Sequence, residues 1–176
     1  VITGIANLIE SRDGSTGLHV KNTQNYVQIL TKALRKKGMY PDILDHNYEL
    51  NTVKASVLHD IGKIKTPDAI LLKPGRLTDE EFEVMKQHTV AGCEIIDRII
   101  GNVEHEEYVD IARKIARYHH ERWDGTGYPD GLSGEEIPLC ARIMALADVF
   151  DALYQDRCYK KAIRPASKVF EIDRKS

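Results

Sequence analysis

The amino-acid sequence predicts an all-α fold, a single compact helical domain that spans residues 1–176. Apolar residues recur at helical spacing along most of the chain, and no stretch alternates convincingly between apolar and polar residues as a half-buried strand would. A length of 176 residues suffices for one domain with a sizeable core and is rather short for two. We therefore expect helices packed around one core.

The first helix is expected over residues 1–10, where isoleucines and an alanine form a short apolar face. A second helix should run from about residue 16 to 37 and stop at Gly38, since glycine commonly follows the C-terminus of a helix. The residues expected to point inward from this second helix are His19, Tyr26, Leu30 and Ala33.

A third helix is expected from about residue 49 to 62, and a fourth begins at Thr78. Thr78 and Glu81 form the capping-box pattern, in which a hydroxyl caps the helix and a glutamate follows three residues later. The apolar residues expected to point inward from these two helices are Val53, Val57, Ile61, Phe82, Met85, Ile96 and Ile99.

Three more helices are expected in the second half of the chain. One covers about residues 106–119, another begins at Pro138, which suits the first position of a helix, and the last begins at Pro165. The helix after Pro138 carries one apolar stripe, formed by Leu139, Ile143, Leu146, Phe150 and Leu153.

The composition is that of an ordinary soluble globular protein, with 42% hydrophobic and 30% charged residues. Because 25 basic and 27 acidic residues give a net charge of -2, we expect no DNA or RNA duplex as a partner. Three cysteines without a CxxC pair favour a reduced, cytoplasmic setting, and no apolar run approaches the ~20 residues of a membrane span. Because the chain begins at Val1, we expect a fragment of a longer signalling protein with a regulatory domain elsewhere; a homodimer is left open.

One carboxylate on the last apolar helix lies where an unpaired charge is costly. Asp148 is about 200° around the helix from Leu146, yet its neighbours four and three residues earlier and four residues later are Met144, Ala145 and Ala152. The helix is apolar on both sides, so Asp148 is expected to be buried. A cation would offset the cost of burying it, and hydrogen bonds from backbone amides are the alternative.

A histidine and an aspartate stand next to each other at His59-Asp60. On a helix they diverge by about 100°, so both can bind ions only near the helix end, which the following Gly62 allows. Lys63 returns to the face of His59, where its ammonium would be a good partner for a phosphate oxygen. A purely structural His-Asp pair is the alternative.

Five histidines are predicted to face the core, namely His19, His59, His88, His119 and His120. A single core histidine is more often structural than a ligand, but burying five of them with Asp60 and Asp148 would be costly without metal. Imidazole suits Zn, Fe, Mn or Ni, and a bridging carboxylate suits harder divalent ions. His46 and His105 stand among polar neighbours and are expected at the surface.

The ordered series of motifs resembles the HD-GYP family, the cyclic di-GMP phosphodiesterase branch of the HD superfamily. The likeness covers roughly residues 13 to 172, and such a series is highly specific although each piece alone is not. The matching segments are Leu58-His59-Asp60-Ile61-Gly62-Lys63-Ile64, Pro67-Asp68-Ala69-Ile70-Leu71, Leu72-Lys73-Pro74-Gly75, Met85-Lys86-Gln87-His88-Thr89, the turn from His119 to Gly131, and Ala147-Asp148-Val149-Phe150-Asp151-Ala152-Leu153.

The resemblance implies an HD-type helical domain with its metal site in the helical core. Two divalent transition-metal ions are expected, Fe or Mn first, with Ni or Zn as alternatives. Two-metal activation of a bridging hydroxide would hydrolyse cyclic di-GMP to linear pGpG, with further cleavage to GMP left open. The ligands implied for one ion are His19, His59, Asp60 and Asp148, and those for the other are His88, His119 and His120, with Asp60 bridging the two.

The resemblance also implies roles around the substrate. Asp60 and Lys63 would be the catalytic residues, with Lys63 neutralising a non-bridging phosphate oxygen. The segment Gly127-Tyr128-Pro129 would form a wall against which the substrate lies. Arg157 and Lys160 look like the family's phosphate-binding basic pair, and a solvated charged loop is the alternative reading of them.

The chain departs from the family pattern near its first histidine. Many relatives have a Glu-Thr-Gly-x-His segment whose glutamate helps to hold a third metal, whereas this chain has Ser15 at the position of that glutamate. Asn22 also replaces a usual arginine, and Lys65 stands where glycine is common. We therefore predict a site for two metals.

Other functions are compatible with the same residues. The chain could bind a cyclic dinucleotide without hydrolysing it, which the loss of a carboxylate at Ser15 favours, or it could hydrolyse another cyclic dinucleotide such as cyclic GMP-AMP. A plain HD phosphohydrolase for mononucleotides is disfavoured, because His88 and the Tyr128-Pro129 turn are additional to the residues that a simple HD enzyme needs.

Overall fold

The structure is a computed structural model that describes residues 2–13, 18–101 and 105–154. Within these ranges the chain is helical and contains no strand, which confirms the predicted all-α class, and no helix there is long and apolar enough to cross a membrane. The α-helices are α1 (Ile2–Glu10), α2 (Leu18–Lys36), α3 (His46–Ala55), α4 (Asp68–Leu71), α5 (Asp79–Lys86), α6 (His88–Ile100), α7 (Glu106–Tyr118) and α8 (Leu139–Tyr154).

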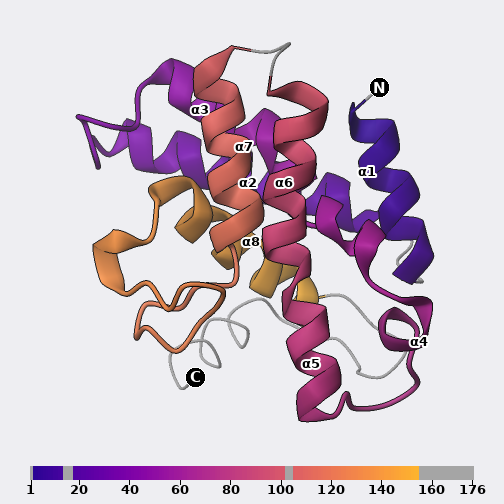
Figure 1. The fold of residues 1–176 in the computed structure, drawn as a ribbon. Coiled ribbons are helices and arrows are strands. Elements are labelled where there is room, and N and C mark those ends of the chain that lie inside the picture. Colours follow the sequence, from indigo (N-terminus) through magenta and orange to yellow (C-terminus); the bar gives the residue numbers. More distant parts are fainter. Residues whose placement is uncertain (1, 14–17, 102–104, 155–176) are drawn as a thin grey trace.

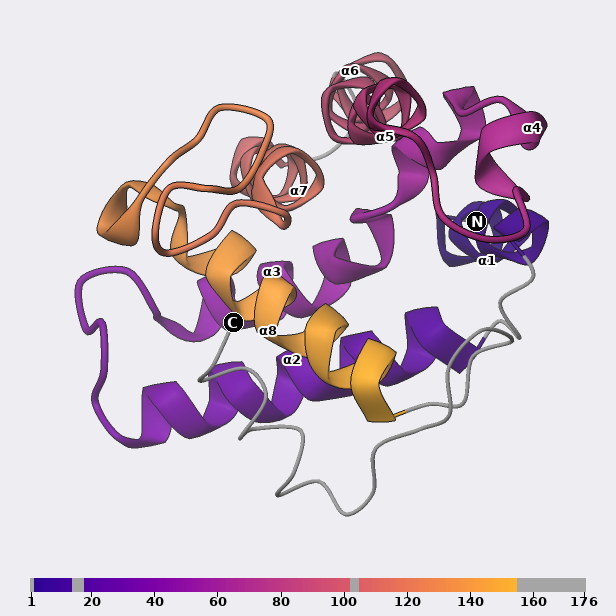
Figure 2. The same cartoon turned by 90° about the horizontal axis from the view of Figure 1, so that it is seen from below.

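Two pairs of helices form the frame of the domain. Helices α6 and α7 lie side by side, as do α2 and α8, while α3 packs on both α2 and α7 (Figures 1 and 2). Val27 of α2, Ala112 and Ile115 of α7, and Met144 and Ala147 of α8 are fully buried in the shared core. The inner faces of helices that are distant in sequence therefore meet at one place.

Helix α2 follows the predicted stripe in part. His19 is buried, and Tyr26 and Leu30 are half-buried against the core, as expected, but Ala33 is exposed and the fully buried face also runs through Thr23, Val27 and Thr31. The two threonine hydroxyls satisfy themselves by donating to the backbone carbonyls four residues earlier, at 2.8 Å in each case. Threonine can therefore occupy the buried face of a helix at little cost, which the apolar pattern alone does not reveal.

The chain around His59 is not the continuous α-helix that was predicted over residues 49–62. Helix α3 ends at Ala55, and the chain continues through two tighter 3₁₀ turns, η2 (Ser56–Leu58) and η3 (Ile61–Lys65). His59 and Asp60 connect these turns, and both are buried. The irregular backbone thus directs both side chains inward, whereas a regular helix would have separated them by about 100°.

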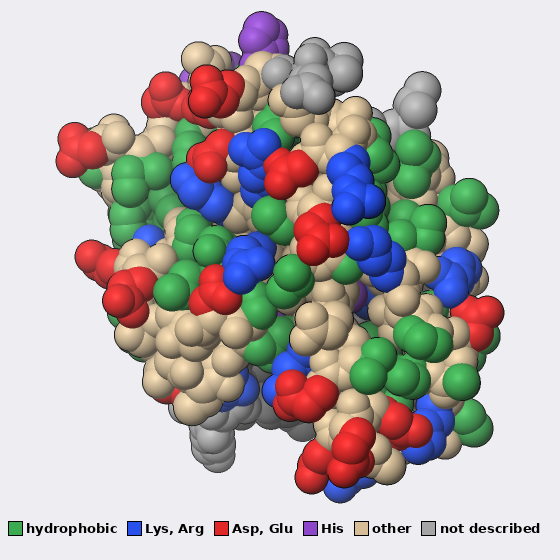
Figure 3. All heavy atoms as spheres, viewed as in Figure 1, with side chains coloured by type: hydrophobic (Ala, Val, Ile, Leu, Met, Phe, Trp, Pro, Cys, Tyr) green, Lys and Arg blue, Asp and Glu red, His purple; other side chains and the backbone are tan. Residues whose placement is uncertain are grey.

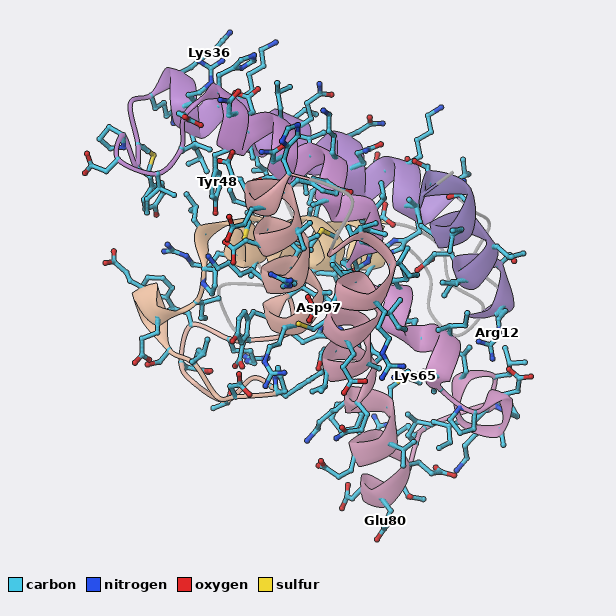
Figure 4. The ribbon with its side chains drawn as sticks, turned by 45° about the horizontal axis from the view of Figure 1, so that its top comes forward. Arg12, Lys36, Tyr48, Lys65, Glu80 and Asp97 are labelled. Atoms are coloured by element: carbon cyan, nitrogen blue, oxygen red, sulfur yellow. The ribbon has the colours of Figure 1, made fainter. Side chains whose placement is uncertain are left out.

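The capping box at Thr78 is present, which confirms that part of the prediction. The helix that it starts is short, because α5 ends at Lys86 and α6 begins anew at His88. Ile96 is buried as predicted, but Phe82 and Ile99 are exposed, so their inward placement was wrong. Helix α5 projects from the body of the domain, with Glu80 near its tip (Figures 1 and 4).

Helix α8 begins directly after Pro138, as predicted. Leu139 and Ile143 are buried, whereas Leu146 is exposed and was wrongly placed in the apolar stripe. The helix expected from Pro165 lies outside the described residues.

Candidate metal centre

The structure brings together the five histidines that were predicted to face the core. Their rings form a continuous series of contacts, with centroids 5.4 Å apart for His19 and His59, 5.3 Å for His59 and His119, 5.5 Å for His88 and His119, and 5.1 Å for His88 and His120. Four of the five are buried and His120 is half-buried. His46 and His105 are exposed, as expected.

Backbone carbonyls orient three of these imidazoles. Nδ1 of His59 donates to Ser56 (2.9 Å), Nδ1 of His88 donates to Met85 (2.7 Å), and Nδ1 of His119 donates to Ile115 (3.0 Å). A carbonyl oxygen can only accept, so Nδ1 carries a proton and Nε2 is the atom directed into the cluster. Histidine ligands of metals are commonly fixed in this way.

The carboxylate of Asp60 lies at the centre of the imidazoles. Its Oδ1 is 3.4 Å from Nε2 of His88 and 3.6 Å from Nε2 of His119, while its Oδ2 is 3.4 Å from Nε2 of His59. Oδ1 and the three Nε2 atoms are buried without a hydrogen-bond partner within the part of the chain that the structure describes. Such unsatisfied atoms are costly unless something binds between them, so their arrangement fits a metal cation.

The potential ligand atoms form two groups that share Asp60. In each group the atoms lie within 4.8 Å of one another; one group contains Asp60, His88, His119 and His120, and the other contains Glu10, His19, His59 and Asp60. A carboxylate common to two imidazole-rich groups would suit divalent cations, which carboxylate and neutral imidazole ligands bind together.

Asp148 does not match its predicted burial. Its side chain is 21% exposed and its Oδ1 lies 3.4 Å from Nε2 of His19, so it stands at the rim of the cluster. The carboxylate that α8 buries is Asp151, one helical turn later, whose Oδ2 is 2.6 Å from Nδ1 of His19. The spacing of three residues places both on one face of α8, and this spacing was the available signal for Asp151.

Glu10 is a second acidic residue that sequence reasoning missed. It lies on the last turn of α1 and is buried among His19, His59 and Asp60. Burial and the negative charge of Asp60 raise its pKa, whereas the positive charge of Lys63 opposes that rise. Because Glu10 follows Ala6 by four residues, it shares the apolar face of the first helix, which would have indicated its burial.

The cluster is electrostatically polarised around Asp60. Burial alone would raise the pKa of Asp60, but Lys63 and His59 hold it well below its ordinary value. Burial opposes charging of His59, yet the charge of Asp60 outweighs it and raises the pKa of His59 to about 9. Burial lowers the pKa of His88 to about 4, so this ring is neutral at pH 7 and suited to binding a cation.

Lys63 contacts the carboxylate oxygen of Asp60 that also faces His59. Its Nζ is 2.7 Å from Oδ2 of Asp60. The backbone of this segment is held by Arg12, which donates to the carbonyls of Lys63 (3.4 Å) and Ile64 (3.2 Å) and pairs with Asp68 (2.6 Å). The N-terminal segment thereby fixes the position of Lys63.

The turn after His120 folds back on the end of α7. The backbone nitrogen of Tyr128 donates to the carbonyl of His120 at 3.2 Å, and the two rings lie 4.8 Å apart and tilted by 30°. A Cβ on Gly127 would come within 2.3 Å of the backbone nitrogen of Arg122, so only glycine fits there. The buried carboxylate of Glu121 accepts from the backbone of Asp130 at 2.7 Å and stabilises the turn.

Tyr128 also faces the first helix of the α5–α6 pair. Its ring lies 6.0 Å from the exposed ring of Phe82, and the ammonium of Lys86 lies 5.1 Å from the Phe82 ring and 5.7 Å from the Tyr128 ring. Pro129 follows Tyr128 through a cis peptide bond and is half-buried. Phe82, which the sequence pattern assigned to the core, instead lies beside Tyr128 at the edge of the histidine cluster.

Three residues singled out by the sequence, Ser15, Arg157 and Lys160, lie outside the described residues. On the described surface, acidic and basic side chains are interspersed over α6 and α7 (Figure 3), where Arg113 pairs with Asp97 and Lys114 pairs with Asp110. Acidic side chains gather instead at the tip of α5, whose first turn carries Asp79, Glu80 and Glu81 (Figure 3).

The HD domain family matches residues 6–175, so the chain belongs to the HD domain family. A cyclic di-GMP phosphodiesterase of Vibrio cholerae serotype O1 is 48% identical over 164 residues, which cover 92% of this chain and 33% of that relative. The cyclic di-GMP phosphodiesterase response regulator RpfG of Xanthomonas campestris pv. campestris is 41% identical over 161 residues, which cover 92% of this chain and 39% of RpfG. These relatives agree with the HD-GYP resemblance of the motifs.

A relative with a different named substrate is also similar. The 3′3′-cGAMP-specific phosphodiesterase 2 of Vibrio cholerae is 39% identical over 160 residues, which cover 91% of this chain and 28% of that protein. The chain thus spans about a third of the length of the curated relatives it matches.

Proposed function

We propose that this chain is a metal-dependent phosphodiesterase domain that hydrolyses cyclic di-GMP to linear pGpG. The observation that carries the proposal is the buried carboxylate of Asp60, which is shared by two groups of side chains that could each hold a metal ion. The names of the relatives with the highest identities quoted above support cyclic di-GMP as the substrate.

Each group of side chains would hold one divalent ion, with iron or manganese as the first candidates. His88, His119 and His120 would bind one ion, and His19, His59 and Asp148 would bind the other, with Asp60 between them. The unsatisfied Nε2 atoms of His59, His88 and His119 support this assignment. Asp148 contributes from the rim, where its Oδ1 faces His19.

When bound, the two ions would lower the pKa of water and stabilise the charge that develops on the phosphate. The protein's own groups would complete the reaction. Asp60 fixes the spacing of the two groups, and the backbone carbonyls of Ser56 and Met85 hold the imidazoles of His59 and His88 in place. Lys63, partly exposed beside Asp60, would neutralise a non-bridging phosphate oxygen.

The substrate would lie against the turn that contains Gly127, Tyr128 and Pro129. The ring of Tyr128 lies 4.8 Å from that of His120 and 6.0 Å from that of Phe82, and this proximity to the metal groups supports a role for Tyr128 in stacking on a nucleobase. Arg157 and Lys160, which lie outside the described residues, are proposed from the sequence to bind phosphate.

A second candidate is hydrolysis of 3′3′-cGAMP, because a relative named for that substrate is 39% identical. The two substrates differ in one base, so both would present the same phosphates to the metal groups. Binding without turnover is the third candidate, and it predicts affinity for a cyclic dinucleotide without release of a linear product.

The test is an assay of the chain with Fe(II) or Mn(II) under anaerobic conditions, with the two cyclic dinucleotides supplied separately and in competition. Chromatography of the products should show linear pGpG, with cyclic di-GMP consumed in preference to 3′3′-cGAMP. If a metal-loaded, folded chain leaves both cyclic dinucleotides unhydrolysed, the proposed activity is contradicted.

A further inference from the structure

We propose that Glu10 is a metal ligand, the carboxylate that completes the ion site formed by His19, His59 and Asp60. This inference rests on the proposed two-ion centre and adds a residue to it. Glu10 is 2% exposed, and one of its carboxylate oxygens lies within 4.8 Å of the ligand atoms of the other three residues. An oxygen donor among two imidazoles and a carboxylate gives a four-residue set for a divalent transition metal.

The position of Glu10 makes it a more enclosed ligand than Asp148. The side chain of Asp148 is 21% exposed, and its Oδ1 lies 3.4 Å from Nε2 of His19. Glu10 is buried at the end of α1, and its carboxylate belongs to the same group of potential ligands as His19, His59 and Asp60. The two carboxylates could therefore bind one ion from a buried and from a more exposed position.

The sequence and packing of α1 explain why Glu10 reaches the site. Ala6 and Ile9 are buried on the same helix, which packs against η2 and η3 on either side of His59 and Asp60. Arg12, two residues after Glu10, donates to the carbonyls of Lys63 and Ile64 and so ties the end of this segment to η3. The last turn of α1 is thereby held against the metal-binding segment.

The charges favour a cation between these groups. Glu10 and Asp60 are two buried carboxylates whose charges act on each other, and Lys63 is one positive charge that acts on both. A divalent ion between the two carboxylates would reduce the repulsion between them. The competing explanation is that Glu10 serves only as a countercharge for Lys63.

The experiment is to measure Mn(II) binding to the metal-free chain by calorimetry and to count bound ions by elemental analysis. The wild-type chain should bind two ions, and Glu10→Gln should weaken one of them at least about tenfold while the other keeps its affinity. Glu49→Gln is the matched control, because Glu49 of α3 is also buried but pairs with Arg35 of α2. This control should bind both ions normally.

A second comparison separates a ligand from a countercharge. In a Lys63→Met background, Glu10→Gln should still weaken the same ion if Glu10 binds metal, and should have no effect if Glu10 only balances Lys63. Circular dichroism spectra that match the wild type exclude misfolding, and Glu10→Asp provides a milder variant with an intermediate loss. If Glu10→Gln binds two ions with unchanged affinity, Glu10 is not a ligand, although the two-ion centre stands. If the wild-type chain binds no ion, the two-ion centre itself is overturned.

Discussion

The ammonium of Lys63 lies 2.7 Å from Oδ2 of Asp60, three residues before it in the chain. The other oxygen of the same carboxylate faces His88 and His119. Lys63 thus contacts the proposed bridging carboxylate, and because the lysine side chain is partly exposed, we propose that an incoming phosphate would meet it there. From this contact we propose that the lysine has a role in catalysis that is separable from the binding of metal.

Replacement of Lys63 by methionine should therefore reduce turnover without emptying the site. We expect kcat to fall about 10²–10³-fold, the usual effect of removing one group that stabilises transition-state charge. Elemental analysis should still find two ions per chain. Lys65→Met is the control, because Lys65 pairs at 2.8 Å with the exposed Glu94 and should leave kcat unchanged. Loss of metal from Lys63→Met would show instead that the lysine supports the site.

Asp60→Asn should lower the occupancy of both ions, because the replacement keeps the volume but removes the charge that the two groups share. Elemental analysis after gel filtration should find fewer than one ion per chain, and turnover should be undetectable. Asp110→Asn, at a surface pair with Lys114, should behave as the wild type. Retention of two ions by the Asp60→Asn variant would exclude the bridging role of Asp60.

Gly62→Ala should disrupt the contact between η3 and α6. A Cβ at this position would lie 1.8 Å from the carbonyl oxygen of His88 and 2.5 Å from the backbone nitrogen of Gly92. Backbone atoms cannot rotate away, so we expect a loss of about 1–3 kcal/mol or more in the free energy of unfolding, together with weaker metal binding.

Thermal unfolding of metal-free and metal-loaded protein checks this prediction. Gly4→Ala is the matched control, because among the described residues no atom outside its own helix backbone and its two chain neighbours lies within 4 Å of the added Cβ, and alanine favours the helix. Its melting temperature should equal or exceed that of the wild type. A Gly62→Ala variant as stable as the wild type would contradict the close approach of η3 and α6.

Tyr128→Ala should weaken substrate binding while the metal content is unchanged. Loss of one base-stacking ring costs roughly 1–3 kcal/mol, so KM should rise about tenfold. Tyr128→Phe keeps the ring and should leave KM close to that of the wild type. If the wild type, Tyr128→Ala and Tyr128→Phe have the same KM, the nucleobase of the substrate does not stack on Tyr128.

The helical fold and the meeting of five histidines could be predicted from the sequence, because helical periodicity is a local and repeated signal. The end of α3 at Ala55 and the helix break at Gln87 could not, since no glycine or proline stands at either place. Those two irregularities decide how His59, Asp60 and His88 enter the site.

The placement of the carboxylates was harder to predict than that of the histidines. Asp148 and Asp151 share a face of α8, and only the packing of α8 against α2 determines that Asp151 is the buried one. Glu10 reaches the site because hydrogen bonds from Arg12 hold its segment to residues more than fifty positions later. Such long-range contacts leave no trace in the local pattern of residues.

The most direct test is a titration of the metal-free chain with Mn(II) under anaerobic conditions, in which bound ions and hydrolysis of cyclic di-GMP are measured in the same samples. The two-ion centre around Asp60 predicts that linear pGpG appears in proportion to occupancy of the second ion. Full activity with a single ion bound, or two ions bound with cyclic di-GMP left intact, would contradict it.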